Sequence, residues 1–281
     1  MIKDIRKLYS TYWEREAVRL KQDAYHSLEF STTFRFLKRY LPKKGLILDA
    51  GGGTGAYTIE LAKLGYDIVL LDYSKHNIDL AKKGIEKSEA GKNVKDVVVG
   101  DITNLSDFTD NSFDAVLCLG GPLSLIYGKL KRRKAMSELT RVAKPGALIF
   151  ISVMNKFGAL SIGPNKWPEE IATKNFISLA TTGDDRLWIG KYYCHYFSLE
   201  EFRDEFRASC KDSTIIDMAG LEGMATASQK AINELAKNKR AWKNWTDMHY
   251  RLCTTQEVIG ASVHMLLVAR KRKRQKLKAT L

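Results

Sequence analysis

The chain has 281 residues, of which 44% are hydrophobic and 28% are charged, and its formal net charge is +14 at pH 7. This composition is ordinary for a globular protein, and no apolar run reaches the roughly 20 residues that a membrane-spanning helix needs. The first residues, MIKDIRKLYS, are too charged for a signal peptide. Scattered cysteines and histidines without ligand spacing argue against a zinc site and a disulfide scaffold. We therefore expect a cytoplasmic protein that neither enters a membrane nor holds a metal ion.

The N-terminal segment, residues 1–44, is predicted to be helical. Apolar and aromatic residues recur there at helical spacing until Pro42 ends the pattern. Its stretch YSTYWERE, residues 9–16, can close over a bound ligand as a lid, or can simply pack the helix onto the rest of the protein. Tyr12 is a candidate active-site residue on the first interpretation, because an aromatic face attracts a cation.

Residues 45–154 alternate between short apolar strands and helices. Strands are predicted over 46–49, 67–72, 96–101, 113–120 and 147–154. Helices are predicted over 56–64, 75–87 and 128–143, and a turn is predicted at Lys144-Pro145-Gly146. Strands that are apolar along their whole length predict a parallel sheet buried on both faces.

The second half of the chain follows this alternation less regularly. Residues 155–198 are rich in glycine, proline and aromatic residues and are predicted to be a substrate-side insertion. Residues 199–270 are predicted to complete the sheet, with a helical insertion. The elements predicted there are a helix over 198–206 with a Ser198–Glu201 capping box, a strand over 213–220, helical structure over 224–251 and a strand over 262–270.

The sequence LDAGGGTG, residues 48–55, joins the first predicted strand to the helix that follows it. Glycine allows a sharp turn and close approach of a ligand to the backbone, and a helix amino end offers unbonded N–H groups. A P-loop is excluded because no Gly-Lys-Ser/Thr follows. Gly51, Gly53 and Ala56 satisfy the spacing of a dinucleotide fingerprint. The acid just before them, Asp49, would repel a pyrophosphate and would suit a cation.

Acidic residues also follow the next two predicted strands. Asp72 ends the second strand, where a carboxylate can accept hydrogen bonds from both hydroxyls of a ribose. Asp101 follows the third strand, where it and the N–H of Ile102 can read an adenine edge. A helix cap or a turn is the structural alternative for both acids. The stretch LGGPLS, residues 119–124, ends the fourth strand at the crevice where doubly wound sheets bind ligands.

Taken in order, the blocks LDAGGGTG, LLDYS, VGDITNL, DNSFDAVLCLGGPL and ELTRVAKPGALIFIS resemble a class I S-adenosylmethionine-dependent methyltransferase. The resemblance is strong over 45–154 and extends in general plan over 198–270. It implies a doubly wound α/β fold with a seven-stranded sheet in the order 3-2-1-4-5-7-6, in which only strand 7 is antiparallel. It also implies S-adenosylmethionine as the cofactor, which carries an ammonium and a sulfonium and no phosphate.

The resemblance implies a cofactor site residue by residue. The glycine loop should line the methionine part of the cofactor, Asp72 should hold the ribose, and the residues after the fourth strand should face the sulfonium. The cofactor-binding residues expected are Asp49, Ala50, Gly51, Gly52, Gly53, Gly55, Asp72, Tyr73, Asp101, Ile102, Leu119 and Gly120.

The acceptor pocket is expected to come from segments outside the sheet. His195 is a candidate general base because histidine titrates near neutral pH. The other catalytic candidates are Tyr193 and Tyr12, and the substrate-binding candidates are Tyr196, His249, Tyr250 and Arg251. Packing of these aromatic residues, and a surface position for Arg251, are the structural alternatives. His264 lies inside a predicted core strand and is expected to be structural.

Two acceptor classes stay open. The first is an oxygen or nitrogen of a small, anionic or aromatic metabolite. The second is a wobble uridine of tRNA, because the DAGGG motif and the late His-Tyr-Arg segment resemble the tRNA 5-carboxymethoxyuridine methyltransferases. The basic stretch GKLKRRK at 128–134 and the basic tail at 271–281 also favour RNA, whereas GGPLSLIYG after strand four departs from that family. A binding protein without catalysis and a dehydrogenase-like use of the fold are further alternatives, and the oligomeric state is open.

Overall fold

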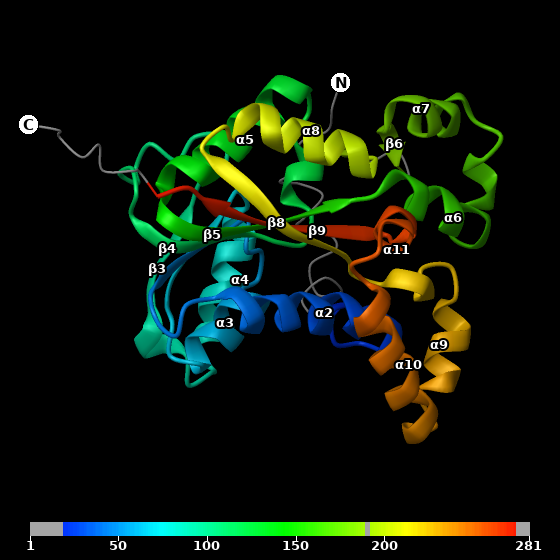
Figure 1. Cartoon of the computed structure of the whole chain (residues 1–281), viewed down its shortest axis with the longest axis horizontal. Coiled ribbons are helices and arrows are strands. Elements are labelled where there is room, and N and C mark those ends of the chain that lie inside the picture. Colours follow the sequence, from blue (N-terminus) through cyan, green and yellow to red (C-terminus); the bar gives the residue numbers. More distant parts are fainter. Residues whose placement is uncertain (1–18, 189–191, 274–281) are drawn as a thin grey trace, which may run out of the picture.

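The computed structural model describes residues 19–188 and 192–273. Its centre is a seven-stranded sheet in the order β3-β2-β1-β4-β5-β9-β8 (Figure 1). The strands are β1 (Leu46–Ala50), β2 (Asp67–Asp72), β3 (Val94–Val99), β4 (Phe113–Cys118), β5 (Ala143–Met154), β8 (Ser213–Gly220) and β9 (His264–Lys271). Only β9 runs antiparallel to its neighbours. The predicted fold class and strand order are confirmed, with β8 and β9 as the sixth and seventh predicted strands.

Helices cover both faces of the sheet (Figure 1). One face carries α2 (Ala24–Tyr40), α3 (Ala56–Lys63) and α4 (Lys75–Glu86), and the other carries α5 (Lys129–Val142) and α8 (Leu199–Ser209). Each helix buries an apolar stripe against the strands, as shown by the fully buried side chains Leu37, Leu61, Met136, Leu139, Phe202 and Phe206. Burial of apolar area of this kind is the main stabilising term of such a core. The sheet is thus held between two layers of helices.

The remaining elements gather at one end of the sheet. They are the helices α6 (Lys156–Lys166), α7 (Lys174–Thr182), α9 (Gln229–Leu235), α10 (Lys239–Leu252) and α11 (Gln256–Ala261), the hairpin β6 (Asp184–Trp188) with β7 (Tyr192–His195), and the short turns η2 (Pro122–Leu125), η3 (Pro168–Glu170) and η4 (Gly223–Ala225). A further short turn, η1 (Gly91–Asn93), directly precedes β3 and contacts α3. The helical prediction for 224–251 corresponds to two helices, α9 and α10. The side chain of Asn238 accepts hydrogen bonds from Arg240 N and Ala241 N, so a new helix begins there.

The predicted turn at Lys144-Pro145-Gly146 is wrong, because these residues belong to β5. The register of β5 against β4 shifts from Phe113↔Ala143 to Ala115↔Leu148. Gly146 has a φ of 87°, which only glycine adopts at little cost. The extra residues of β5 therefore form an irregular start of the strand. The Lys-Pro-Gly sequence, which is typical of a turn, lies at this irregularity.

The helical prediction for the N-terminal segment can be followed only from Arg19. Asp23 caps α2 by accepting a hydrogen bond from His26 N, and the helix ends at Tyr40, just before Pro42. The lid stretch YSTYWERE, with Tyr12, lies outside the described residues. Within the described residues, no helix combines the length and the apolar character needed to cross a membrane.

Candidate functional site

A cavity of about 750 Å³ opens where the parallel strands end. Its first part, the glycine-loop half, is formed by the residues after β1, β2, β3 and β4: Gly51, Gly52, Gly53, Asp72, Tyr73, Asp101, Ile102, Leu119 and Gly120. Its second part, the aromatic half, is formed by Tyr25, Tyr57, Tyr127, Trp167 and Tyr196, together with Glu29, Glu222 and His264. The volume lies within the roughly 300–1,000 Å³ of small-molecule sites. The two halves belong to one continuous cavity.

The glycine loop is tightly held by its neighbours. Gly51 N and Gly52 N donate to the carbonyl oxygen of Leu71 at 2.7 and 3.1 Å. Gly51 has a φ of 79°, and a Cβ there would lie 2.6 Å from Pro122 Cγ. Gly53 also has a left-handed φ of 58°, but a Cβ there would meet no protein atom within 4 Å. The loop therefore leaves open space above Gly53, where a ligand can approach the backbone.

Asp72 links the end of β2 to this loop. Its Oδ2 accepts a hydrogen bond from Gly53 N at 2.9 Å, and its Oδ1 accepts from Ser74 N and Asn77 Nδ2 at 2.9 and 2.7 Å. Burial raises the pKa of Asp72, although these hydrogen bonds oppose the shift. The carboxylate is fixed in orientation, and its Oδ2 retains one lone pair for a hydroxyl donor.

Asp49 takes a different place from the one expected of it. Its carboxylate lies directly beneath Gly52, accepts a hydrogen bond from Thr58 Oγ1 at 2.7 Å, and does not line the cavity. Burial raises the pKa of Asp49 to about 6. Ala50 and Gly55, which were also expected to contact a cofactor, are buried and do not line the cavity either. These three residues support the loop from behind.

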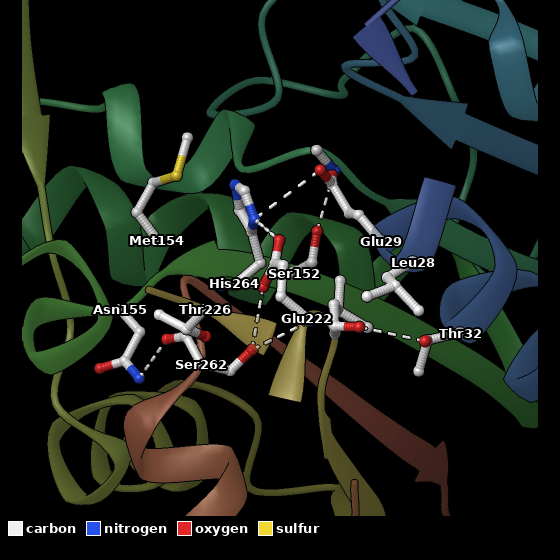
Figure 2. Close-up of polar contacts among 12 residues, drawn as sticks. Leu28, Glu29, Thr32, Ser152, Met154, Asn155, Glu222, Thr226, Ser262 and His264 are labelled. Carbon is white, nitrogen blue, oxygen red and sulfur yellow. Dashed lines mark hydrogen bonds and ion pairs between the residues drawn. The ribbon is translucent and has the colours of Figure 1, made fainter. Parts of the chain in front are cut away.

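A buried charged cluster closes the aromatic half. The Nδ1 of His264, at the start of β9, lies 2.5 Å from Glu222 Oε1 and 3.7 Å from Glu29 Oε2 of α2 (Figure 2). Glu222 Oε2 accepts hydrogen bonds from Ser262 Oγ and His264 N, both at 2.9 Å. Arg19 forms an ion pair with Glu29 at 2.6 Å. The other ring nitrogen of His264 is buried and has no hydrogen-bond partner in the described residues.

Comparisons with known proteins agree with this geometry. A family model described as "Methyltransferase domain" matches residues 48–151. A glycine/sarcosine N-methyltransferase of Aphanothece halophytica is 28% identical over 109 residues, which are 39% of this chain and 40% of that protein. A tRNA 5-carboxymethoxyuridine methyltransferase of Escherichia coli (strain K12) is 26% identical over 126 residues, 45% of this chain and 46% of that protein. The matches thus span less than half the length of these two relatives.

Residues 48–151 form a methyltransferase domain of the class I S-adenosylmethionine-dependent family. The PH0226 protein of Pyrococcus horikoshii OT3 has the same fold, with a TM-score of 0.64 at 16% identity over 96% of this chain and 100% of that one. The methyl donor of the family is S-adenosylmethionine. The residues present fit this molecule, because the open left-handed loop, the oriented Asp72 and the pair Asp101–Ile102 line one half of one cavity.

The acceptor-side candidates divide into two groups. Tyr196 lines the aromatic half. His249 does not, because it is buried behind it with Nε2 at 2.8 Å from Thr32 Oγ1, and burial lowers the pKa of His249 to about 4. Tyr250 stacks with Arg35, and Arg251 is exposed. The structure thus brings only Tyr196 of these four to the cavity.

His195 and Tyr193 also lie outside the cavity, because alternate residues of a strand point to opposite sides. Both nitrogens of the buried His195 are taken, Nδ1 by Asp184 Oδ1 at 2.8 Å and Nε2 by Glu201 Oε1 at 3.0 Å. Tyr193 donates to the same Asp184 at 2.6 Å. The proposed base is therefore part of a structural network, and the expectation that it faces an acceptor is not met. Glu201 bonds to His195, so only the Ser198 half of the predicted capping box forms.

Replacing His195 with glutamine is expected to lower the free energy of unfolding by roughly 1–3 kcal/mol, because two carboxylates lose their shared partner. The affinity for S-adenosylhomocysteine is expected to stay as in the wild type, since His195 does not line the cavity. Urea unfolding and calorimetry measure the two quantities, with the exposed His76→Gln as control. Unchanged stability together with weakened ligand binding would contradict this assignment.

Sequence reasoning missed Glu29 and Glu222 and placed His264 in the core. One signal was available. Glu29 lies on the buried face of α2 between Leu28 and Thr32, where an unpaired acid is costly. An acid on the apolar face of an amphipathic helix indicates a partner elsewhere in the chain.

Proposed function

We propose that the protein transfers a methyl group from S-adenosylmethionine to a small molecule held in the aromatic half of the cavity. The observation that carries this proposal is the continuity of the cavity. The glycine-loop half and the aromatic half share one space, so a donor and a small acceptor can be held side by side. Holding two reactants in the correct geometry supplies a large part of the rate enhancement of such a transfer.

In this proposal the glycine-loop half binds the cofactor. Asp72 accepts a hydrogen bond from a ribose hydroxyl, Asp101 and Ile102 flank the adenine, and the bare backbone at Gly53 lies against the methionine part. Leu119 and Gly120 lie where the two halves meet. Bound there, S-adenosylmethionine supplies an activated methyl carbon and a good leaving group. The protein's own task is to orient the acceptor and to exclude water.

The aromatic half supports a small acceptor with a flat apolar body. Tyr25, Trp167 and Tyr196 are each less than a tenth exposed and contribute large apolar faces to the wall. Aromatic faces bind flat rings well, by stacked or edge-to-face contacts. The charged cluster at Glu222 and His264 is the polar end of this wall. The pocket therefore combines apolar contact with a few polar groups, as small-molecule sites do.

The structure gives a tRNA acceptor less support than the sequence did. Of the basic stretch on α5, Arg132 is buried and forms an ion pair with Glu205 at 3.2 Å, and Lys131 lines the cavity. Arg132 is therefore not a free contact for a phosphate backbone, whereas Lys129, Lys131 and Lys134 are exposed. Most of the basic tail lies outside the described residues.

The acceptor class is tested by incubating the purified protein with S-adenosylmethionine labelled in its methyl group and a cell extract split into RNA and small-molecule fractions. We expect the label in the small-molecule fraction. Binding of tRNA is measured in parallel at several salt concentrations, because contacts to phosphates make affinity fall steeply with salt. Label in the RNA fraction, with salt-dependent tRNA binding, would overturn the small-molecule assignment. No binding of the cofactor at all would overturn the proposed activity.

A further inference from the structure

The His264 ring is an unusual feature of the cavity wall. It is 6% exposed, it lines the aromatic half, and its Nε2 has no hydrogen-bond partner in the described residues. A buried polar atom without a partner costs free energy, and in a residue of the cavity wall such an atom is a candidate contact for a ligand. Figure 2 shows that this nitrogen points away from Glu222 and Glu29.

The Glu222 carboxylate fixes the orientation of the ring. Its Oε1 bonds to Nδ1 of His264, and its Oε2 is held by Ser262 Oγ and the His264 backbone N–H. Asn155 fixes the chain around Ser262, because its Nδ2 donates to the carbonyl oxygens of Ile259, Gly260 and Ser262. A carboxylate on Nδ1 keeps the proton on that nitrogen when the ring is neutral, so Nε2 is the nitrogen that gains or loses a proton. The arrangement is that of an oriented acid–base histidine.

We propose that the aromatic half takes an acceptor with a hydroxyl group on an aromatic ring, and that His264, oriented by Glu222, holds this hydroxyl at Nε2 and stabilises its ionised form. This inference rests on the proposed methyl transfer. When the ring of His264 is neutral, the O–H bond of the acceptor breaks and the proton forms a bond to Nε2. When the ring is already protonated, the hydroxyl proton leaves to water. In both cases the pair is an imidazolium and a phenolate, whose oxygen is a better nucleophile than a neutral hydroxyl.

The charges around His264 favour this pair. Burial alone would lower the pKa of His264, but the carboxylates of Glu29 and Glu222 outweigh it and raise the pKa to about 9. Arg19 opposes them more weakly. The imidazolium therefore persists up to about pH 9, and above that pH the neutral ring takes the proton from the hydroxyl.

Two titratable groups near His264, Tyr25 and His249, are neutral at neutral pH. Burial raises the pKa of the Tyr25 hydroxyl, so it is neutral, and it donates to Thr226 O at 2.8 Å. Burial lowers the pKa of His249 on α10 to about 4, so this ring is neutral as well. His26 on α2 bonds to Asp23 at 2.8 Å. The carboxylates of Glu29 and Glu222 therefore dominate the field at the ring.

A metal site is the competing interpretation of Glu29, Glu222 and His264, whose ligand atoms all lie within 4.8 Å of one another. The geometry favours a hydrogen bond between His264 and Glu222 over a shared metal ion. His264 Nδ1 and Glu222 Oε1 are 2.5 Å apart, which is a hydrogen-bond distance. Two donor atoms on one zinc ion would lie about 3 Å apart or more, given metal–ligand bonds near 2.0–2.2 Å. Glu29 Oε2 already forms an ion pair with Arg19 Nη1 at 2.6 Å.

The test uses 4-nitrophenol, whose ionised form has its own absorption band. The full-length protein is saturated with S-adenosylhomocysteine, the probe is added, and the absorption is followed against pH. In the wild type, the bound probe is expected to ionise at least about one pH unit below the free probe, a tenfold change in its ionisation constant. In His264→Gln this shift is expected to disappear. In Glu222→Gln the probe is expected to ionise at a higher pH than in the wild type, because the imidazolium is less stable.

Controls separate this inference from the proposed activity. His76→Gln, an exposed change on α4, is expected to give the wild-type spectrum. Binding of S-adenosylhomocysteine, measured by calorimetry, is expected to be equal in the wild type and in His264→Gln, which also shows that the variant folds. Normal binding of S-adenosylhomocysteine without an ionised bound probe, equal spectra in wild type and His264→Gln, or an ionisation that EDTA abolishes would overturn the role of His264. Failure of the wild type to bind S-adenosylhomocysteine would overturn the proposed activity instead.

Discussion

Replacing Asp72 with alanine is expected to weaken the binding of S-adenosylhomocysteine by about 100-fold or more. A hydrogen bond to a charged group contributes roughly 1.5–3 kcal/mol, and the ribose would lose this acceptor. The change also removes the carboxylate that accepts from Gly53 N and Ser74 N, so the glycine loop loses a support. Isothermal titration calorimetry measures the affinity.

A nearby acid supplies the control for this experiment. Asp79 is exposed on α4 and pairs only with Lys75 among the salt bridges of the described residues. Asp79→Ala is expected to bind S-adenosylhomocysteine as the wild type does, since exposed ion pairs of this kind contribute little. Equal affinities for Asp72→Ala and Asp79→Ala would show that Asp72 does not hold the ligand.

Alanine at Gly51 and alanine at Gly53 are expected to fail in different ways. At Gly51, the methyl group would lie 2.6 Å from Pro122 Cγ, and the φ of 79° is itself unfavourable for alanine. Overpacking and left-handed strain together are expected to lower the free energy of unfolding by roughly 2–5 kcal/mol. At Gly53, only the strain of about 1–2 kcal/mol applies, because the methyl group meets no protein atom.

Gly51→Ala is expected to have the larger effect on stability, and Gly53→Ala is expected to have the larger effect on ligand affinity. The methyl group at Gly53 would occupy the space into which the cofactor is proposed to fit, so Gly53→Ala is expected to lose affinity for S-adenosylhomocysteine while it remains folded. Urea unfolding and calorimetry on both variants measure stability and affinity separately. Wild-type affinity in a folded Gly53→Ala protein would mean that the ligand does not approach the loop there.

The sheet and the glycine-loop half could be predicted because their signals are local. A strand, a run of glycines and a helix follow one another within residues 46–63, and the side chain of Asp72 lies at the end of the next strand. Parallel strands bring their carboxyl ends to one edge, so residues that follow different strands meet without any further information. Asp49 was the exception, because the sequence shows its position in the loop but not the side on which its carboxylate lies.

The aromatic half could not be predicted in the same way. Glu29, Glu222 and His264 come from α2, the residue before η4, and the first residue of β9, so no spacing along the chain relates them. His195 looked suitable because aromatic residues surround it in the sequence. Its side chain points away from the cavity, because Cys194 and Tyr196 occupy the cavity side of β7 and the segment after it. Which face of a strand lies inward depends on tertiary contacts.

A crystal structure of the full-length protein with S-adenosylhomocysteine tests the account most directly. We predict a ribose hydroxyl within hydrogen-bond distance of the Asp72 carboxylate, the adenine beside Asp101 and Ile102, and the sulfur at the junction with the aromatic half, on the side of His264. A ligand bound elsewhere, or a ribose that does not contact Asp72, would contradict the account.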